Sequence, residues 1–136
     1  MVGIEIRGVV ASGFGQGKEF LSMPHYIEKI NAAVGFMPFP GTLNLKVTGG
    51  ELRRAISDVR AIEIGSFEAE GKEFGALKLY KCVIGDVDCA MIVPQKSRHA
   101  ADIIEIIAAV NLREKQTLID GKEVIVSDFR GRINGT

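Results

Sequence analysis

A glycine-rich segment near the N-terminus has the composition of a phosphate-binding loop. The run Gly13-Phe14-Gly15-Gln16-Gly17-Lys18 follows a predicted strand and ends in a cation. Glycines allow several backbone N–H groups to point at one anion, and a lysine adds positive charge there. The run matches neither a Walker A motif, because of Ser12 and Glu19, nor a dinucleotide fingerprint, because of Lys18. By itself it is compatible with a phosphate cradle and with an ordinary flexible turn.

A second candidate site lies on a predicted strand, Thr42–Val47. Residues two apart on a strand point to the same face, so Thr42 and Asn44 share one face while the leucines beside them point to the core. A hydroxyl oxygen and an amide oxygen then converge without charge. Such a pair suits Mg²⁺, which takes few protein ligands and completes its octahedron with waters and phosphates. The alternative is the polar outer face of an ordinary strand.

The third group of candidates lies in the C-terminal half of the chain. It consists of Ser97, of Glu105 and of the segment Val110-Asn111-Leu112-Arg113. Each member also has an ordinary structural interpretation: Ser97 as a helix cap, Glu105 as the solvated side of a helix, and Arg113 as a partner of a helix dipole. Spacing alone does not assign these residues a function.

The elements that would position these residues are mostly short strands. We predict strands over Gly3–Ala11, Thr42–Val47, Ala61–Ile64, Ser66–Ala69, Phe74–Ile84, Val87–Val93, Gln116–Ile119 and Glu123–Phe129, with turns at Gly65, Glu70-Gly71, Gly85-Asp86 and Asp120-Gly121. We predict helices from an N-cap at Ser22, with Pro24 in the first turn, to Gly35, over Glu51–Val59, and over Ala100–Val110. Short, mostly antiparallel strands with inserted helices favour a β-barrel, here as one domain over residues 1–136.

The two cysteines lie on either side of a predicted hairpin. A type II′ turn at Gly85-Asp86 would place Cys82 directly opposite Cys89. In a reducing cytosol two free thiols are favoured over a disulfide bond. Neither cysteine is a convincing metal ligand, because no other cysteine and only two distant histidines are present.

Charge and hydropathy limit the partners. The 136 residues include 17 Lys plus Arg and 17 Asp plus Glu, and the balance holds in each half of the chain. Without a basic surplus, a general affinity for nucleic acid is not expected. No apolar run approaches the roughly 18 residues of a membrane span, and the charged N-terminus is unlike a signal peptide. We therefore expect a cytoplasmic protein with no nucleic-acid or membrane partner.

Taken together and in this order, these segments resemble the archaeal CTP-dependent riboflavin kinases. The matching residues are Val10–Lys18 with Phe20–Ser22, Gly35–Leu45, Ile92–His99, Ile103–Ala108, and Leu112-Arg113 before Asp120-Gly121. The glycine run and the Gly-Thr-Leu-Asn-Leu segment at this distance are specific in combination. The resemblance implies a six-stranded cradle-loop (RIFT-like) β-barrel. It also implies transfer of the terminal phosphoryl group of CTP to the 5′-hydroxyl of riboflavin, giving FMN and CDP.

The resemblance also implies roles for the candidate residues. The nucleotide would contact Gly13, Phe14, Gly15, Gln16, Gly17, Lys18 and Glu19 together with Val110, Asn111, Leu112 and Arg113; Mg²⁺ would be held by Thr42 and Asn44; and the flavin would contact Ser97 and Glu105. Glu105 is the candidate general base or orienting group, and Lys18 the candidate catalytic cation. The family usually has Thr where this chain has Ser97, and the Asn111–Arg113 segment varies. We expect a monomer without the N-terminal helix-turn-helix domain of some relatives.

Two other functions remain open at this point. A non-catalytic β-barrel module that binds a nucleotide or a flavin would keep the glycine run but would not need Thr42 and Asn44 on one face. A flavin kinase that uses ATP would need the same site. The residues contain no base-reading motif, so the expectation of CTP rests on the resemblance.

Overall fold

The computed structural model describes residues 5–12, 19–94 and 102–132. The glycine run at 13–18 and Ser97 lie outside the described residues.

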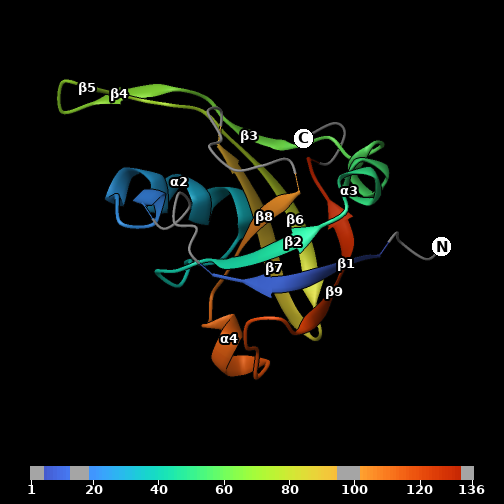
Figure 1. Cartoon of the computed structure of the whole chain (residues 1–136). Helices are drawn as coiled ribbons and strands as arrows, with labels where there is room; N and C mark the ends of the chain where they lie inside the picture. Colours follow the sequence, from blue (N-terminus) through green and yellow to red (C-terminus); the bar gives the residue numbers. More distant parts are fainter. Residues whose placement is uncertain (1–4, 13–18, 95–101, 133–136) are drawn as a thin grey trace.

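Six antiparallel strands form a closed barrel (Figure 1). They are β1 (Ile6–Ala11), β2 (Leu43–Val47), β6 (Leu77–Ile84), β7 (Val87–Pro94), β8 (Ile103–Ala108) and β9 (Glu123–Arg130). Around the barrel they follow the order β6-β7-β8-β2-β1-β9, and β9 also pairs with β6, which closes the sheet on itself. The six-stranded barrel with inserted helices confirms the predicted fold class.

Alternate side chains of the barrel strands fill its interior. Leu43 and Leu45 on β2 meet Ile104 and Ile106 on β8, and all four are buried. Each fully buried side chain of this size contributes roughly 2 kcal/mol of hydrophobic stabilisation. Gly8 on β1 faces the same interior, where a Cβ atom would lie 3.0 Å from that of Leu45. The absence of a side chain at this glycine therefore lets β1 and β2 pack closely.

A second core lies on the outer face of the barrel, under the helix α2 (Pro24–Val34). Tyr26 and Ile30 belong to this core, as do side chains of β6, β7 and β8. The helix ends at Gly35, as predicted, with a left-handed φ of 84°. The predicted N-cap at Ser22 is wrong: the N-cap residue is Met23, and the Ser22 hydroxyl donates instead to the Glu19 carbonyl oxygen at 2.7 Å.

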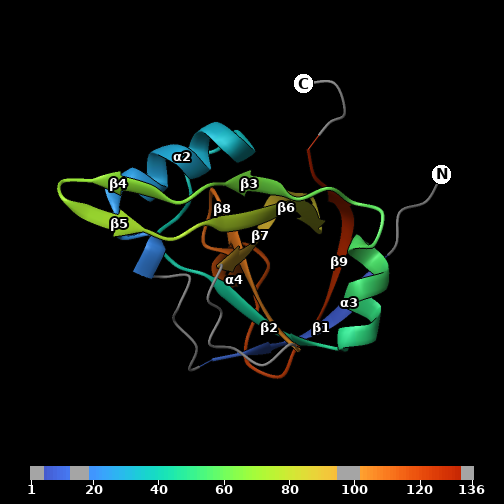
Figure 2. The same ribbon diagram turned by 90° about the horizontal axis from the view of Figure 1, so that it is seen from above.

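Three further strands extend the barrel wall into an arm beside α2 (Figure 2). They are β3 (Ile62–Ile64), which pairs with β6, and β4 (Phe67–Ala69) and β5 (Lys72–Phe74), which pair with each other. The predicted turn at Gly65 is wrong, because the chain continues past it into the arm, and the predicted strand Phe74–Ile84 is interrupted between β5 and β6. The turn at Glu70-Gly71 is confirmed. The Tyr26 hydroxyl donates to the Gly75 carbonyl oxygen at 2.7 Å and so ties the arm to α2.

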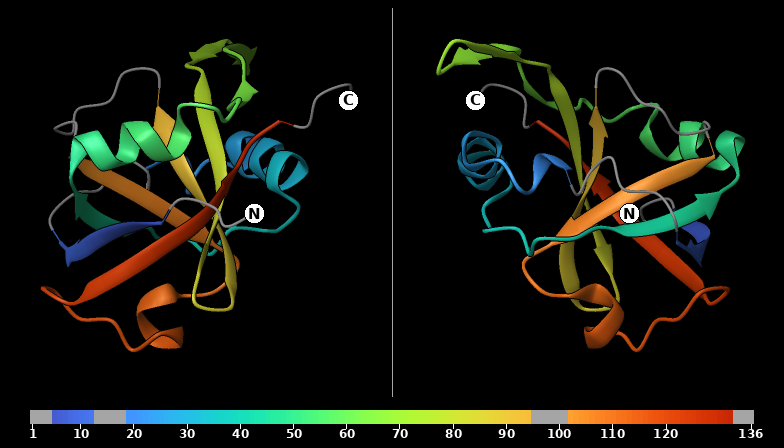
Figure 3. Two further views of the ribbon diagram at one scale, coloured as in Figure 1. Left: turned by 90° about the vertical axis from the view of Figure 1, so that its right-hand side faces the viewer. Right: turned by 60° about the vertical axis from the view of Figure 1, so that its left-hand side comes forward.

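Two short helices lie at opposite ends of the barrel (Figure 3). The helix α3 (Gly49–Ile56) packs Leu52 against the interior core, and α4 (Leu112–Lys115) contributes Leu112 to it. α3 confirms the predicted short helix, shifted toward the N-terminus. None of the helices within the described ranges combines the length and the apolar character needed to cross a membrane.

The helix predicted over Ala100–Val110 is wrong, because most of the described part of this segment, Ile103–Ala108, forms β8. Its isoleucines have the spacing of a buried helix face, but they are also β-branched residues that suit a strand. Ile104 and Ile106 point into the barrel, while Ile107 points to the core under α2. Since both faces of β8 are buried, the alternation that marks a strand is missing from the sequence.

The strand predicted over Gln116–Ile119 is also wrong. This segment follows α4 as a turn in which Thr117 has a φ of 54° and the Leu118 N–H donates to the Arg113 carbonyl oxygen at 2.8 Å. The residue pair Asp120-Gly121 then leads into β9, as expected, with a φ of 89° at Gly121.

The hairpin between β6 and β7 places the two cysteines as predicted. Gly85 has a φ of 62° while Asp86 is not among the residues with positive φ, in agreement with a type II′ turn. Cys82 and Cys89 are register partners, and both are free thiols in the barrel core. Burial raises the pKa of Cys82, and it raises the pKa of Cys89 to about 12.

We therefore expect both thiols to be inert in the folded protein. The thiolate is the reactive species, so these raised pKa values lower the rate of reaction with an aromatic disulfide reagent at pH 8 by roughly a hundredfold or more. Colorimetric titration before and after unfolding in guanidinium chloride measures this difference. Rapid reaction of two thiols in the folded protein would show that the hairpin is not packed as described.

Candidate functional site

Four residues form a row across the outer wall of the barrel. Ala11 on β1 is the register partner of Asn44 on β2, Asn44 is the partner of Glu105 on β8, and Glu105 is the partner of Ile92 on β7. Neighbouring strands are separated by about 4.8 Å, so Ala11 and Glu105 are about 10 Å apart. The structure therefore brings a candidate metal ligand and the candidate base side by side from distant parts of the sequence.

Thr42 joins this row from the residue before β2. Its hydroxyl donates to Glu105 Oε1 at 3.1 Å. Only 1% of Glu105 and 6% of Asn44 is exposed. Asn44 is therefore a buried position of the outer wall rather than a solvated one. We name Thr42, Asn44 and Glu105 the oxygen cluster.

The oxygen cluster has the donor chemistry that Mg²⁺ prefers. It combines a hydroxyl, an amide and a carboxylate, and the Asn44 Oδ1 atom is buried. Hard oxygen donors of this kind suit a small divalent cation that keeps several waters. Among the described residues no three His, Cys, Asp or Glu side chains gather in one place. The cluster thus fits Mg²⁺ with few protein ligands. It differs from the predicted uncharged pair by the carboxylate of Glu105.

The sequence indicates Glu105 as a candidate residue but does not place it beside the candidate metal ligands, because its pattern assigns Glu105 to the solvated side of a helix. Burial of a charged group is costly unless hydrogen bonds or charges compensate it. Glu105 is the one charged residue within β8, and its neighbours in that strand are isoleucines. A single acid inside an apolar, β-branched run is the signal that would have indicated a buried functional strand.

The segment Val110–Arg113 follows β8, and its last two residues begin α4. Asn111 caps α4, since its Oδ1 accepts from the Glu114 N–H at 3.3 Å. A cavity of about 170 Å³ separates this segment from Thr42 and its neighbours Gly41 and Leu43, and residues from both sides line it. The candidate nucleotide segment and the start of the candidate metal strand thus share one cavity.

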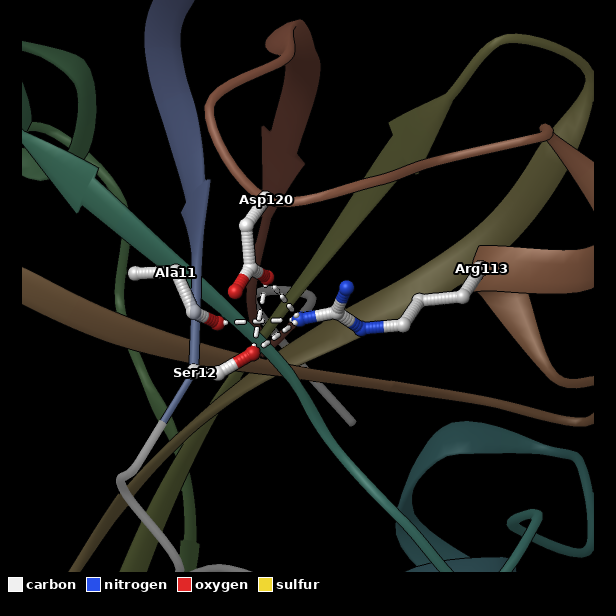
Figure 4. Close-up of polar contacts among 4 residues, drawn as sticks. All are labelled: Ala11, Ser12, Arg113 and Asp120. Atoms are coloured by element: carbon white, nitrogen blue, oxygen red, sulfur yellow. Dashed lines mark hydrogen bonds and ion pairs between the residues drawn. The ribbon is translucent and has the colours of Figure 1, made fainter.

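Arg113 reaches from α4 to the end of β1 (Figure 4). Its Nη2 atom donates to the Ala11 carbonyl oxygen at 3.1 Å, to Ser12 Oγ at 2.9 Å and to Asp120 Oδ1 at 2.9 Å. The Ser12 hydroxyl donates to the same Asp120 oxygen at 2.7 Å. Hydrogen bonds from Ser12 and Arg113 hold the pKa of Asp120 below its usual value. We name Ser12, Arg113 and Asp120 the arginine cluster.

The arginine cluster lies where the glycine run begins. Ser12 is the last described residue before that run, and Ala11 is the register partner of Asn44. The arginine cluster and the oxygen cluster are therefore linked through a single residue at the end of β1. Ser12 and Asp120 were not singled out as functional in the sequence, because only the folded chain brings them to Arg113. Glu19 lies after the run and is helical, as is Phe20, and a turn at Leu21-Ser22 separates the two from α2.

Comparison with known proteins gives one family over most of the chain. The family model CTP-dep_RFKase, described as "Domain of unknown function DUF120", matches residues 10–127. These residues include both clusters.

Individual relatives carry the name riboflavin kinase. The chain is 38% identical to the protein of Archaeoglobus fulgidus over 125 residues, which is 90% of this chain and 54% of the relative. It is 39% identical to the protein of Methanoregula boonei over 111 residues, 80% of this chain and 50% of the relative. With the protein of Saccharolobus solfataricus it shares 39% identity over 130 residues, 93% of this chain and 74% of the relative. The chain therefore spans about half the length of the first two relatives and about three quarters of the third.

Proposed function

Because the chain belongs to the CTP-dependent riboflavin kinase family, we propose that it transfers the terminal phosphoryl group of CTP to the 5′-hydroxyl of riboflavin. The products are FMN and CDP. The observation that supports this reaction best is the oxygen cluster, because a buried carboxylate and two neutral oxygen ligands meet beside the strand that leads into the glycine run.

The nucleotide binds between the two candidate segments in this proposal. Backbone N–H groups of residues 13–19 surround its phosphates, with the charge of Lys18, and Val110–Arg113 contacts the remainder. The cavity that this second segment shares with Thr42 supports the arrangement. The choice of CTP over ATP follows from the family.

Thr42 and Asn44 would hold Mg²⁺, which when bound neutralises charge on the phosphate oxygens. The hydrogen bond from Thr42 to Glu105 supports this role, since a hydroxyl that gives its proton to a carboxylate presents its lone pairs elsewhere. Glu105 therefore orients the Thr42 oxygen as well as the substrate.

Glu105 and Ser97 contact the flavin in this proposal. Phosphoryl transfer needs little covalent work from a protein, so positioning accounts for most of the rate. Glu105 accepts the hydrogen bond of the 5′-hydroxyl, aligns its oxygen with the terminal phosphorus and takes its proton.

A non-catalytic module that binds a nucleotide or a flavin is disfavoured by the oxygen cluster, because binding alone does not need a buried carboxylate beside two oxygen ligands. The test is to incubate the protein with riboflavin, Mg²⁺ and each of the four nucleoside triphosphates and to separate the flavins by chromatography. The proposal predicts FMN with CTP. FMN with ATP alone would identify the alternative donor, and no FMN with any donor would favour the binding module.

A further inference from the structure

The position of Asp120 is fixed by the backbone of the barrel. The Gly121 N–H donates to the Val10 carbonyl oxygen at 2.8 Å, and the Val10 N–H donates to the Lys122 carbonyl oxygen at 2.9 Å. These bonds continue the β1–β9 ladder, in which Val9 pairs with Glu123. Asp120 therefore projects from a fixed turn, whereas Arg113 reaches it with a long, flexible side chain.

Figure 4 shows the hydrogen bonds of the arginine cluster, and the atoms that each bond joins define its direction. Ser12 has one hydroxyl proton and donates it to Asp120, so its oxygen accepts from Arg113. Asp120 accepts from both residues through the same oxygen atom. Without this acceptor the hydroxyl of Ser12 would be free to rotate, and Arg113 would lose its one charged partner in the cluster.

The benefit of Asp120 at this position is geometric rather than electrostatic. A carboxylate next to a phosphate site weakens the attraction that Arg113 and Lys18 provide. The side chain of Asp120 is 59% exposed, and exposed ion pairs contribute little stability. The role of the Asp120 carboxylate is therefore to fix the positions of Ser12 and Arg113.

We propose that Asp120 is a positioning residue of the nucleotide site, which holds Arg113 and Ser12 at the start of the glycine run. This inference rests on the proposed function. Asp120 acts on the nucleotide only through the two residues that it holds, and its oxygen rather than its charge is required.

The test measures CTP binding by calorimetry with Mg²⁺ and without riboflavin. Asp120→Ala removes the acceptor, and we expect about tenfold weaker binding, the equivalent of one charge-assisted hydrogen bond. Asp120→Asn keeps an oxygen acceptor and removes the charge, so we expect binding at least as tight as that of the unchanged protein. Glu123→Gln is the matched control. Glu123 lies nearby at the start of β9 and forms an exposed ion pair with Arg7 on β1, so its replacement removes one carboxylate and should leave CTP binding unchanged.

A double-mutant comparison separates positioning from other effects. If Asp120 acts through Arg113, Asp120→Ala causes little further loss of CTP affinity in an Arg113→Ala background. In that background Ser12 is the one remaining residue of the arginine cluster that Asp120 positions. Thermal unfolding of each variant shows that it is folded at the temperature of the measurement. Unchanged or tighter binding by Asp120→Ala, or the same tenfold loss in both backgrounds, overturns the inference alone. If the protein without substitutions binds no nucleoside triphosphate, the proposed function is wrong and this inference is wrong with it.

Discussion

Replacement of Asn44 by alanine lowers the rate of FMN formation by about a hundredfold at millimolar Mg²⁺, the scale expected when a residue that sets metal affinity is lost. Asn44 is buried between Ala11 and Glu105, so another side chain has little room to replace its oxygen. The loss is partly restored by excess Mg²⁺, since the remaining oxygens bind the cation more weakly. Initial rates over a range of Mg²⁺ concentrations measure both effects.

Lys46→Ala is the control for this variant. Lys46 lies on the same strand and the same face, two residues further on, but it is exposed. We expect its FMN formation and its dependence on Mg²⁺ to match those of the unchanged protein. Thr42→Ala should behave like Asn44→Ala. Full activity in both of these variants at low Mg²⁺ would remove the metal assignment.

Replacement of Glu105 by glutamine lowers kcat by about a hundredfold, the lower end of the usual range for general acid–base catalysis. Glutamine has the same shape and keeps an oxygen that can accept from Thr42, so we expect the fold and riboflavin binding to persist. The variant loses the ability to take the proton of the 5′-hydroxyl. Turnover measured under saturating substrates, together with riboflavin affinity from quenching of flavin fluorescence, separates the two effects.

Glu63→Gln on the exposed part of β3 is the matched control for the loss of one carboxylate. It should leave both kcat and flavin affinity unchanged. If Glu105→Gln keeps its kcat but binds riboflavin more weakly, Glu105 is a flavin contact and its assignment as the base is wrong.

The barrel could be predicted because its strands are short and bounded by glycine-containing turns. The hairpin at Gly85-Asp86 is an example, since a two-residue turn fixes its own register and so placed Cys82 opposite Cys89. β8 could not be predicted in this way. It contacts the barrel interior on one face and α2 on the other, and the resulting apolar run has no period that separates a strand from a helix.

The candidate site could be predicted only within single strands. The sequence spacing of Thr42 and Asn44 predicts that both side chains lie on one face, because residues two apart in a strand point to the same side. The contact with Glu105 depends on pairing between β2 and β8, which are about 60 residues apart, and the contact of Arg113 with Ser12 depends on α4 at the end of the barrel. Such pairings are set by closure of the whole barrel. The roles of the glycine run and of Ser97 stay predictions.

A crystal structure of the protein with CDP, Mg²⁺ and FMN would show whether phosphoryl transfer takes place at the oxygen cluster. We expect Mg²⁺ to be bound by Thr42 and Asn44, the phosphates of CDP to lie between residues 13–19 and Arg113, and Glu105 to face the phosphorylated end of FMN. A nucleotide or metal bound on another face of the barrel, with the oxygen cluster filled only by protein and water, would contradict this expectation.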